Sequence, residues 1–312
     1  MIPVFNAILP IFLLILSGQG LRHVPLFTAD FWRGMDTLGY YVLYPALLFV
    51  TIMRADFSAL TLDSVAIALG GANLVSVVGV LLAWPLLRAT SKISRPGFSS
   101  VFQATVRWNG FMAFAVAERL FPPEGAAMVA LVMAFLIIPV NIEAVAVVSW
   151  FAGKDPNFGA VLRKIAINPM VLATGSALVV RALPFTLPEP LMQMLDLVAR
   201  AALGMGLLSI GAGLKPRNVL RPNAALVLAT AAKLILYPAL VLALALALGL
   251  QGDQISYLAL CAAVPTAMNG YVLARQMGGD AELYAAIVTV QTAAAFLTIP
   301  AVLAIANQLS GG

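Results

Sequence analysis

The stretch Val264–Ala274 reads V-P-T-A-M-N-G-Y-V-L-A and decides how this chain folds. It lies inside an apolar run long enough to span a membrane, yet it contains Pro265, Asn269 and Gly270. Proline removes a backbone donor and clashes with the preceding turn, and glycine loosens a helix, so we expect the helix to break here. In hydrocarbon, a broken helix is tolerated only where it is buried in protein or lines a watery cavity.

A similar stretch occurs in the first half of the chain, where Val106–Phe114 reads V-R-W-N-G-F-M-A-F. Its Asn109-Gly110 pair matches Asn269-Gly270 at a distance of 160 residues, although this stretch has no proline. Two interrupted membrane helices at corresponding positions of two halves indicate the substrate site of a transporter.

The composition requires a lipid environment for the rest of the chain as well. Of the 312 residues, 62% are hydrophobic and 10% are charged, whereas a soluble domain has roughly a quarter charged residues. The single cysteine, Cys261, cannot form an internal disulfide. The formal charge of +5 comes from residues in short loops between apolar runs, so it indicates membrane orientation and no nucleic-acid partner.

Ten apolar segments, each near the ~20 residues that a bilayer requires, predict ten transmembrane helices. The loops on one side hold twelve Lys and Arg residues and those on the other side hold three, so we expect both termini on the side of the membrane opposite the cytoplasm. The segments are Val4–Leu21, Thr37–Met53, Ser64–Leu87, Phe98–Ala117, Gly125–Trp150, Ala160–Val180, Leu191–Leu214, Ala224–Leu248, Ile255–Met277 and Leu283–Ala306.

The two halves of the chain show a weak sequence repeat with a nearly constant offset. Ala7-Ile8-x-Pro10 recurs as Ala166-Ile167-x-Pro169, and Ile138-Pro139 recurs as Ile299-Pro300. Residues 1–153 and 158–312 each hold five predicted helices, and an odd number makes the halves run oppositely through the membrane. We therefore expect an all-α polytopic membrane protein with a 5+5 inverted repeat, in which the fourth and ninth helices are broken and cross.

These motifs resemble the auxin efflux carrier family over essentially the whole chain. The resemblance is carried by P-I-F-L-L-I-L-S-G in the first helix, Y-Y-V-L-Y-P-A-L-L-F in the second, and the two Asn-Gly stretches. That family includes plant PIN-type carriers and bacterial permeases often associated with malonate or malate, and it is similar in fold to bile-acid sodium symporters. Only Phe151–Gly159 joins the fifth and sixth helices, which favours a bacterial-type member in the inner membrane.

The resemblance also implies that the helices form two groups with different roles in transport. Helices 1, 2, 6 and 7 would form a scaffold that dimerises, and helices 3–5 and 8–10 would form a mobile transport core. The matched asparagines, Asn109 and Asn269, would hold the carboxylate of the substrate where the broken helices cross. Family members often have proline at the first break as well, so its absence here makes that break the less certain of the two.

Asn109 and Asn269 are also the first candidates by their chemistry, since an amide offers two donors and an acceptor without a buried charge. Pro265, Gly110 and Gly270 would shape the breaks, and the half-helices that follow would aim their positive N-terminal ends at one point. The alternative is that each asparagine only satisfies backbone groups that the break exposes.

Charged side chains inside the predicted helices are the next candidates. Arg107 and Lys233 lie deep in apolar segments, where each costs at least ~2.5–3.5 kcal/mol and requires an anionic substrate or an internal acid. The alternative for Arg107 is that it points away from the site and packs structurally. Glu143 is the candidate for carrying a coupling proton or cation, or for pairing with either base. Asp196 and Arg200, four residues apart, predict an ion pair on one helix face.

We therefore predict a secondary transporter that moves a small organic anion, a mono- or dicarboxylate similar to auxin or malonate, by elevator-type alternating access. One alternative is a sodium-coupled, bile-acid-like symporter; these have an acid in the ninth helix, and Ile255–Met277 has none. Another is a membrane-embedded sensor or enzyme, but no HExxH, CxxC, P-loop or GxSxG pattern occurs. We expect no cofactor and no metal ion. As partners we expect membrane lipid and a second copy of the chain.

Overall fold

The computed structural model describes residues 2–54, 62–91, 93–152, 159, 163, 166–167, 169–184, 187–214 and 223–310, and their regular structure is all helical. The predicted boundary between the halves, residues 153–158, lies outside them. The helices are α1 Ile2–Leu21, α2 Ala29–Leu38, η1 Gly39–Leu43, α3 Tyr44–Arg54, α4 Leu62–Ser91, α5 Arg95–Val106, α6 Gly110–Leu120, α7 Pro123–Ala152, α9 Pro169–Ala182, α10 Glu189–Gly213, α12 Ala224–Ala231, η2 Ala232–Leu236, α13 Tyr237–Ala247, α14 Asp253–Ala263, α15 Asn269–Met277 and α16 Ala281–Leu309.

Six stretches of these helices are long and apolar enough to cross a membrane. The prediction that the chain is an integral membrane protein is therefore confirmed. Large apolar side chains on their outer faces are exposed, as Leu82 is at 74% and Leu197 at 71%, and lipid is the medium that suits such a surface. The spans are Val4–Leu21, Ala29–Arg54, Ser64–Ser91, Glu189–Gly213, Ala224–Ala247 and Ala281–Leu309, and a shorter apolar helix covers Pro139–Ala152.

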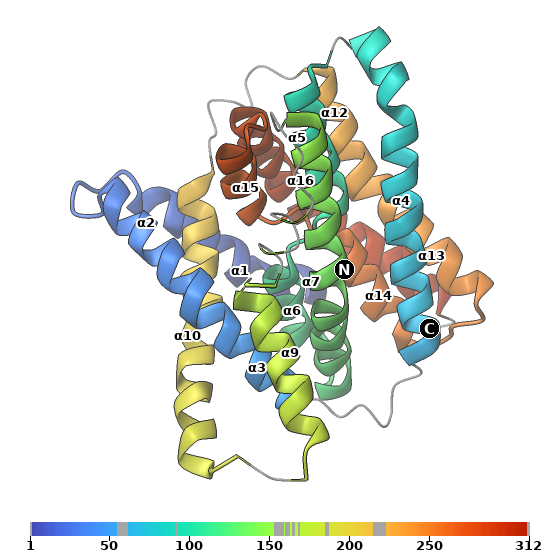
Figure 1. The fold of residues 1–312 in the computed structure, drawn as a ribbon. Helices are drawn as coiled ribbons and strands as arrows, with labels where there is room; N and C mark the ends of the chain where they lie inside the picture. The colour runs from blue at the N-terminus through green and yellow to red at the C-terminus, as the bar shows by residue number, and fades with distance from the viewer. Residues whose placement is uncertain are drawn as a thin grey trace.

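The helices form two groups that can be followed in Figure 1. On one side of the view, α3 packs against α9 and α10, and α10 also packs against α1. On the other side, α13 packs against α4 and α14, while α5 packs against α7 and α14 against α16. Contacts of α1 with α6, and of α3 with α7, join the groups.

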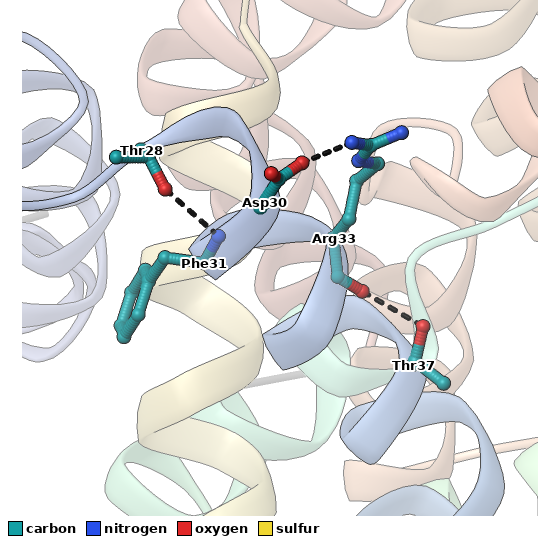
Figure 2. A network of polar contacts seen from close by, with 5 residues as sticks. All are labelled: Thr28, Asp30, Phe31, Arg33 and Thr37. Carbon is teal, nitrogen blue, oxygen red and sulfur yellow. Dashed lines mark hydrogen bonds and ion pairs between the residues drawn. The ribbon is translucent and has the colours of Figure 1, made fainter.

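The second span begins with a capped turn, shown in Figure 2. The Thr28 hydroxyl accepts a hydrogen bond from the Phe31 N–H at 3.3 Å, as an N-cap residue does. Arg33 forms an ion pair with Asp30, and the Thr37 hydroxyl donates to the Arg33 carbonyl at 2.7 Å. The Thr28 cap satisfies one of the free N–H groups at the start of α2, and from there the helix continues through η1 into α3.

Two spans contain a single wide turn immediately before a Tyr-Pro pair. In η1 the Tyr44 N–H bonds the Gly39 carbonyl, and in η2 the Tyr237 N–H bonds the Ala232 carbonyl, five residues back in both cases. A proline ring clashes with the carbonyl four residues before it, and a π-turn relieves that clash without ending the helix. Pro45 and Pro238 therefore deform their helices, whereas the chain breaks completely at the two Asn-Gly stretches.

Candidate functional site

The first Asn-Gly stretch separates α5 from α6. The helix ends at Val106, Arg107 has extended backbone angles, and α6 begins at Gly110. The Asn109 Oδ1 accepts a hydrogen bond from the Met112 N–H at 3.1 Å and so caps the new helix. The predicted break is therefore present without a proline, because the asparagine supplies a partner for the backbone that the break exposes.

The second stretch separates α14 from α15 and touches the first. The helix ends at Ala263, Val264 is extended, and α15 begins at Asn269. The Pro265 carbonyl, which the break leaves without a helical partner, accepts a hydrogen bond from the Asn109 N–H at 2.8 Å. The two interruptions, far apart in the sequence, are thus joined directly through their backbones.

Gln291 of α16 holds this junction in place. The side chain is fully buried, and its Oε1 accepts from the Thr266 N–H at 2.9 Å. Its Nε2 donates to the carbonyls of Ala104 and Ala229 at 3.2 and 3.1 Å. One buried amide therefore ties the second break to α5 and α12, which satisfies backbone groups that hydrocarbon could not.

A cavity of about 70 Å³ lies beside this junction. One water needs about 10–15 Å³, so the space is sufficient for several waters or a small organic molecule. The cavity is bounded by both breaks and by residues from α3 and α7. Its lining residues are Leu48, Arg107, Trp108, Gly110, Phe111, Met133, Val140, Asn141, Ala267 and Asn269.

Arg107 lines this cavity and therefore does not point away from it. The side chain is 5% exposed, and its Nε donates to the Gln103 Oε1 at 3.2 Å. Its Nη1 donates to the Oδ1 atoms of Asn141 and Asn269 at 3.2 and 3.3 Å. These acceptors are neutral amides, and within the described residues Arg107 forms no ion pair and its Nη2 forms no hydrogen bond.

The two predicted asparagines have different surroundings. Asn269 is exposed to the cavity and bonds Arg107. Asn109 is 2% exposed, caps α6 and is not among the lining residues. Gly110 lines the cavity as well, whereas Gly270 is buried behind it against Tyr284.

Lys233 and Glu143 lie away from the cavity lining. Lys233 is fully buried, its Nζ lies 4.2 Å from the centre of the Tyr237 ring, and it has no hydrogen-bond partner among the described residues. Glu143 accepts hydrogen bonds from the Asn73 Nδ2 at 2.8 and 3.0 Å. In the described part of the chain it pairs with neither Arg107 nor Lys233, so that alternative for Glu143 is wrong.

The predicted ion pair between Asp196 and Arg200 is confirmed, with 2.8 Å between Oδ2 and Nε. Asp196 also pairs with Arg54 at 2.9 Å, which links α10 to α3. The arginine side chains are 57% and 74% exposed, so this cluster lies at the surface of the molecule and outside the cavity.

Several residues of the site were not candidates in the sequence. Asn141 and Gln291 carried a usable signal, because each is an amide inside an apolar segment. The apolar lining residues Leu48, Phe111 and Met133 carried none, since any of them could equally face lipid. Within the part of the chain that the structure describes, no three His, Cys, Asp or Glu side chains gather as a metal site would require.

Comparison with known proteins shows which proteins this chain is similar to. A family model described as "Membrane transport protein" matches residues 157–303. The "Putative malonate transporter" of Rhizobium meliloti (strain 1021) is 27% identical over 97% of this chain and 96% of the relative. The "Uncharacterized transporter YfdV" of Escherichia coli (strain K12) is 24% identical over 86% of each. The resemblance to the auxin efflux carrier family is thereby confirmed.

Proposed function

We propose that this integral membrane protein, a relative of the auxin efflux carrier family, is a secondary transporter that binds a small organic anion at Arg107. The observation that carries the proposal is a buried guanidinium on a cavity wall whose hydrogen-bond partners among the described residues are all neutral amides. A charge inside a membrane protein is costly and marks a functional site by default. An anion in the cavity would supply the missing charge.

The chemistry of arginine favours a carboxylate as that anion. A guanidinium presents a planar fork of donors that fits two carboxylate oxygens, and Nη2 is the donor that the described residues leave unused. The neutral oxygens of Gln103, Asn141 and Asn269 orient the group without neutralising it. The charge thus remains available for a ligand.

The two helix breaks support the same assignment. Gly110 begins α6, Asn269 begins α15, and both line the cavity. The N-terminal end of a helix carries unsatisfied N–H groups and about half a positive charge, which favours an anion. Two such ends beside one guanidinium therefore favour a negatively charged ligand in this cavity.

The proposed mechanism is elevator-type alternating access by a 5+5 inverted repeat of residues 1–153 and 158–312. The scaffold would consist of α1, α2 to α3, α9 and α10, and the remaining helices would form the core. In support, Leu48 of α3 lines the cavity opposite residues of α6, α7 and α15. A site on the boundary between two helix groups changes its access when one group slides along the other. Two copies would associate through the scaffold.

The test is uptake of labelled carboxylates, malonate among them, by purified protein in proteoliposomes. We expect saturable uptake that does not require sodium, because no acid lies in Ile255–Met277. Uptake that disappears when potassium replaces sodium would favour the bile-acid-like symporter. Absence of binding and uptake for every small carboxylate would contradict the proposal itself.

A further inference from the structure

We infer that the preferred substrate is a monocarboxylate with a short apolar tail, rather than a dicarboxylate. This inference rests on the proposed function and assigns its substrate class. It follows from the unequal chemistry of the two sides of the cavity, which provide for one charge and for one apolar group.

The polar side of the cavity has a place for a single carboxylate. Arg107 is the one formally charged side chain among the described lining residues, and the amides of Asn141 and Asn269 lie beside it. The starts of α6 at Gly110 and of α15 at Asn269 lie on the same cavity, and each adds only a partial positive charge. Both amides bond Arg107, whose guanidinium is the one full positive charge of this group, so the group suits one carboxylate.

The remaining wall is apolar and aromatic. It is formed by Leu48, Trp108, Phe111, Met133 and Val140, none of which carries a charge. Phe111 is held by stacking on Tyr44 of α3, with ring centroids 4.1 Å apart and an angle of 24° between the planes. This wall is therefore preorganised by packing across the two helix groups.

A second carboxylate placed against that wall would lose its water and find no cation there among the described lining residues, which is strongly unfavourable. A short alkyl tail would instead gain free energy with each buried methylene. The other buried cation, Lys233, cannot supply the missing partner, because its Nζ lies against the Tyr237 ring and it does not line the cavity.

A matched pair of ligands tests the inference by titration calorimetry on the purified full chain. In 3-methylbutanoate an isopropyl group replaces the second carboxylate of malonate, so the two have the same number of heavy atoms and differ mainly in charge. At neutral pH we expect 3-methylbutanoate to bind about tenfold tighter or more, since malonate must bury an unpaired charge. Lowering the pH, which turns malonate into a monoanion, should narrow the difference.

Malonate binding at neutral pH as tightly as 3-methylbutanoate, or tighter, would overturn the inference. Arg107→Gln separates this failure from that of the proposed function. If malonate is preferred and Arg107→Gln abolishes its binding, the anion site stands and only the substrate class is wrong. If neither ligand binds the parent protein, both proposals fail.

A second variant tests the apolar wall independently. Phe111→Ala should shift the preference toward longer tails, so that hexanoate gains affinity relative to 3-methylbutanoate. Phe31→Ala, at a 44% exposed position in α2 outside the cavity, is the matched control and should leave the ratio unchanged. An unchanged ratio in Phe111→Ala would also contradict the inference.

Discussion

Asn109 and Asn269 match in the sequence but have different roles in the proposed site. Asn109 precedes its helix and caps it, whereas Asn269 is the first residue of its helix and leaves its side chain for the cavity. The second break also begins earlier relative to its Asn-Gly pair, since α14 ends at Ala263 whereas α5 ends at Val106. For Asn109 the contacts are those of a residue that satisfies exposed backbone.

We predict that alanine at the two positions will separate binding from stability. Asn269→Ala should weaken carboxylate binding by about five- to tenfold, through loss of a hydrogen-bonding group beside the anion. Asn109→Ala should cost about 1 kcal/mol of stability through the lost cap, with a smaller effect on affinity. Calorimetry and thermal unfolding of each purified variant measure the two effects, and equal losses of affinity in both variants would contradict this assignment.

Lys233 is a buried lysine that the proposed site does not use. Its Nζ contacts the Tyr237 ring and finds no acceptor among the described residues. We predict that Lys233→Met will raise the stability by about 1–3 kcal/mol, because an apolar chain of similar length replaces a buried amine that has no acceptor among the described residues. Thermal unfolding measures the change. A loss of stability would show that the contact with Tyr237 outweighs the desolvation of the charge.

At the scale of the elements, the second break depends on a close approach at Gly270. A Cβ at this position would lie 2.2 Å from the Tyr284 hydroxyl. Tyr284 is fully buried and donates to the Ala267 carbonyl at 2.6 Å, so it cannot move aside without losing a bond inside the junction. Position 270 therefore requires glycine because a larger side chain would collide with Tyr284, in addition to its role in interrupting the helix.

We predict that Gly270→Ala will destabilise the protein by about 1–3 kcal/mol, as overpacking of a filled core does. Gly204→Ala is the matched control, because Gly204 lies inside α10 with nothing within 4 Å of an added Cβ. The control should be neutral or slightly stabilising, since alanine favours a helix. Thermal unfolding of both variants in one detergent provides the comparison, and equal stabilities would contradict the packing described for Tyr284.

The elements differ in how well the sequence predicted them. Both breaks were predictable, because Asn-Gly inside an apolar span gives the backbone a polar partner and weakens the helix. The π-turns were not predicted, although Pro45 and Pro238 marked their positions, since a proline in a span can kink, break or widen a helix. Arg107 was predictable as a buried charge. Its direction depends on Gln103, one turn earlier in α5, and on Asn141, which only the packing of α5 against α7 brings near it.

At the scale of the whole molecule, the distribution of basic residues predicts the orientation in the membrane. Twelve Lys and Arg residues in the loops of one side, against three on the other, predict that both termini lie outside the cytoplasm. A reporter fused to the C-terminus, active only outside the cytoplasm, should therefore give a signal. A signal from a cytoplasmic reporter at the same position would mean that the number of spans or the orientation is wrong.

The central claim is that Arg107 binds the transported anion, and the affinity of Arg107→Gln for the best carboxylate ligand tests it most directly. We expect Arg107→Gln to bind the ligand about ten- to hundredfold more weakly, because the carboxylate loses a charged hydrogen-bonded partner. Arg107→Lys should recover part of the affinity, because lysine keeps the positive charge but lacks the planar pair of donors. Arg33→Gln, which removes an exposed arginine paired with Asp30, is the matched control and should bind like the parent. Parental affinity in a folded Arg107→Gln protein would contradict the account.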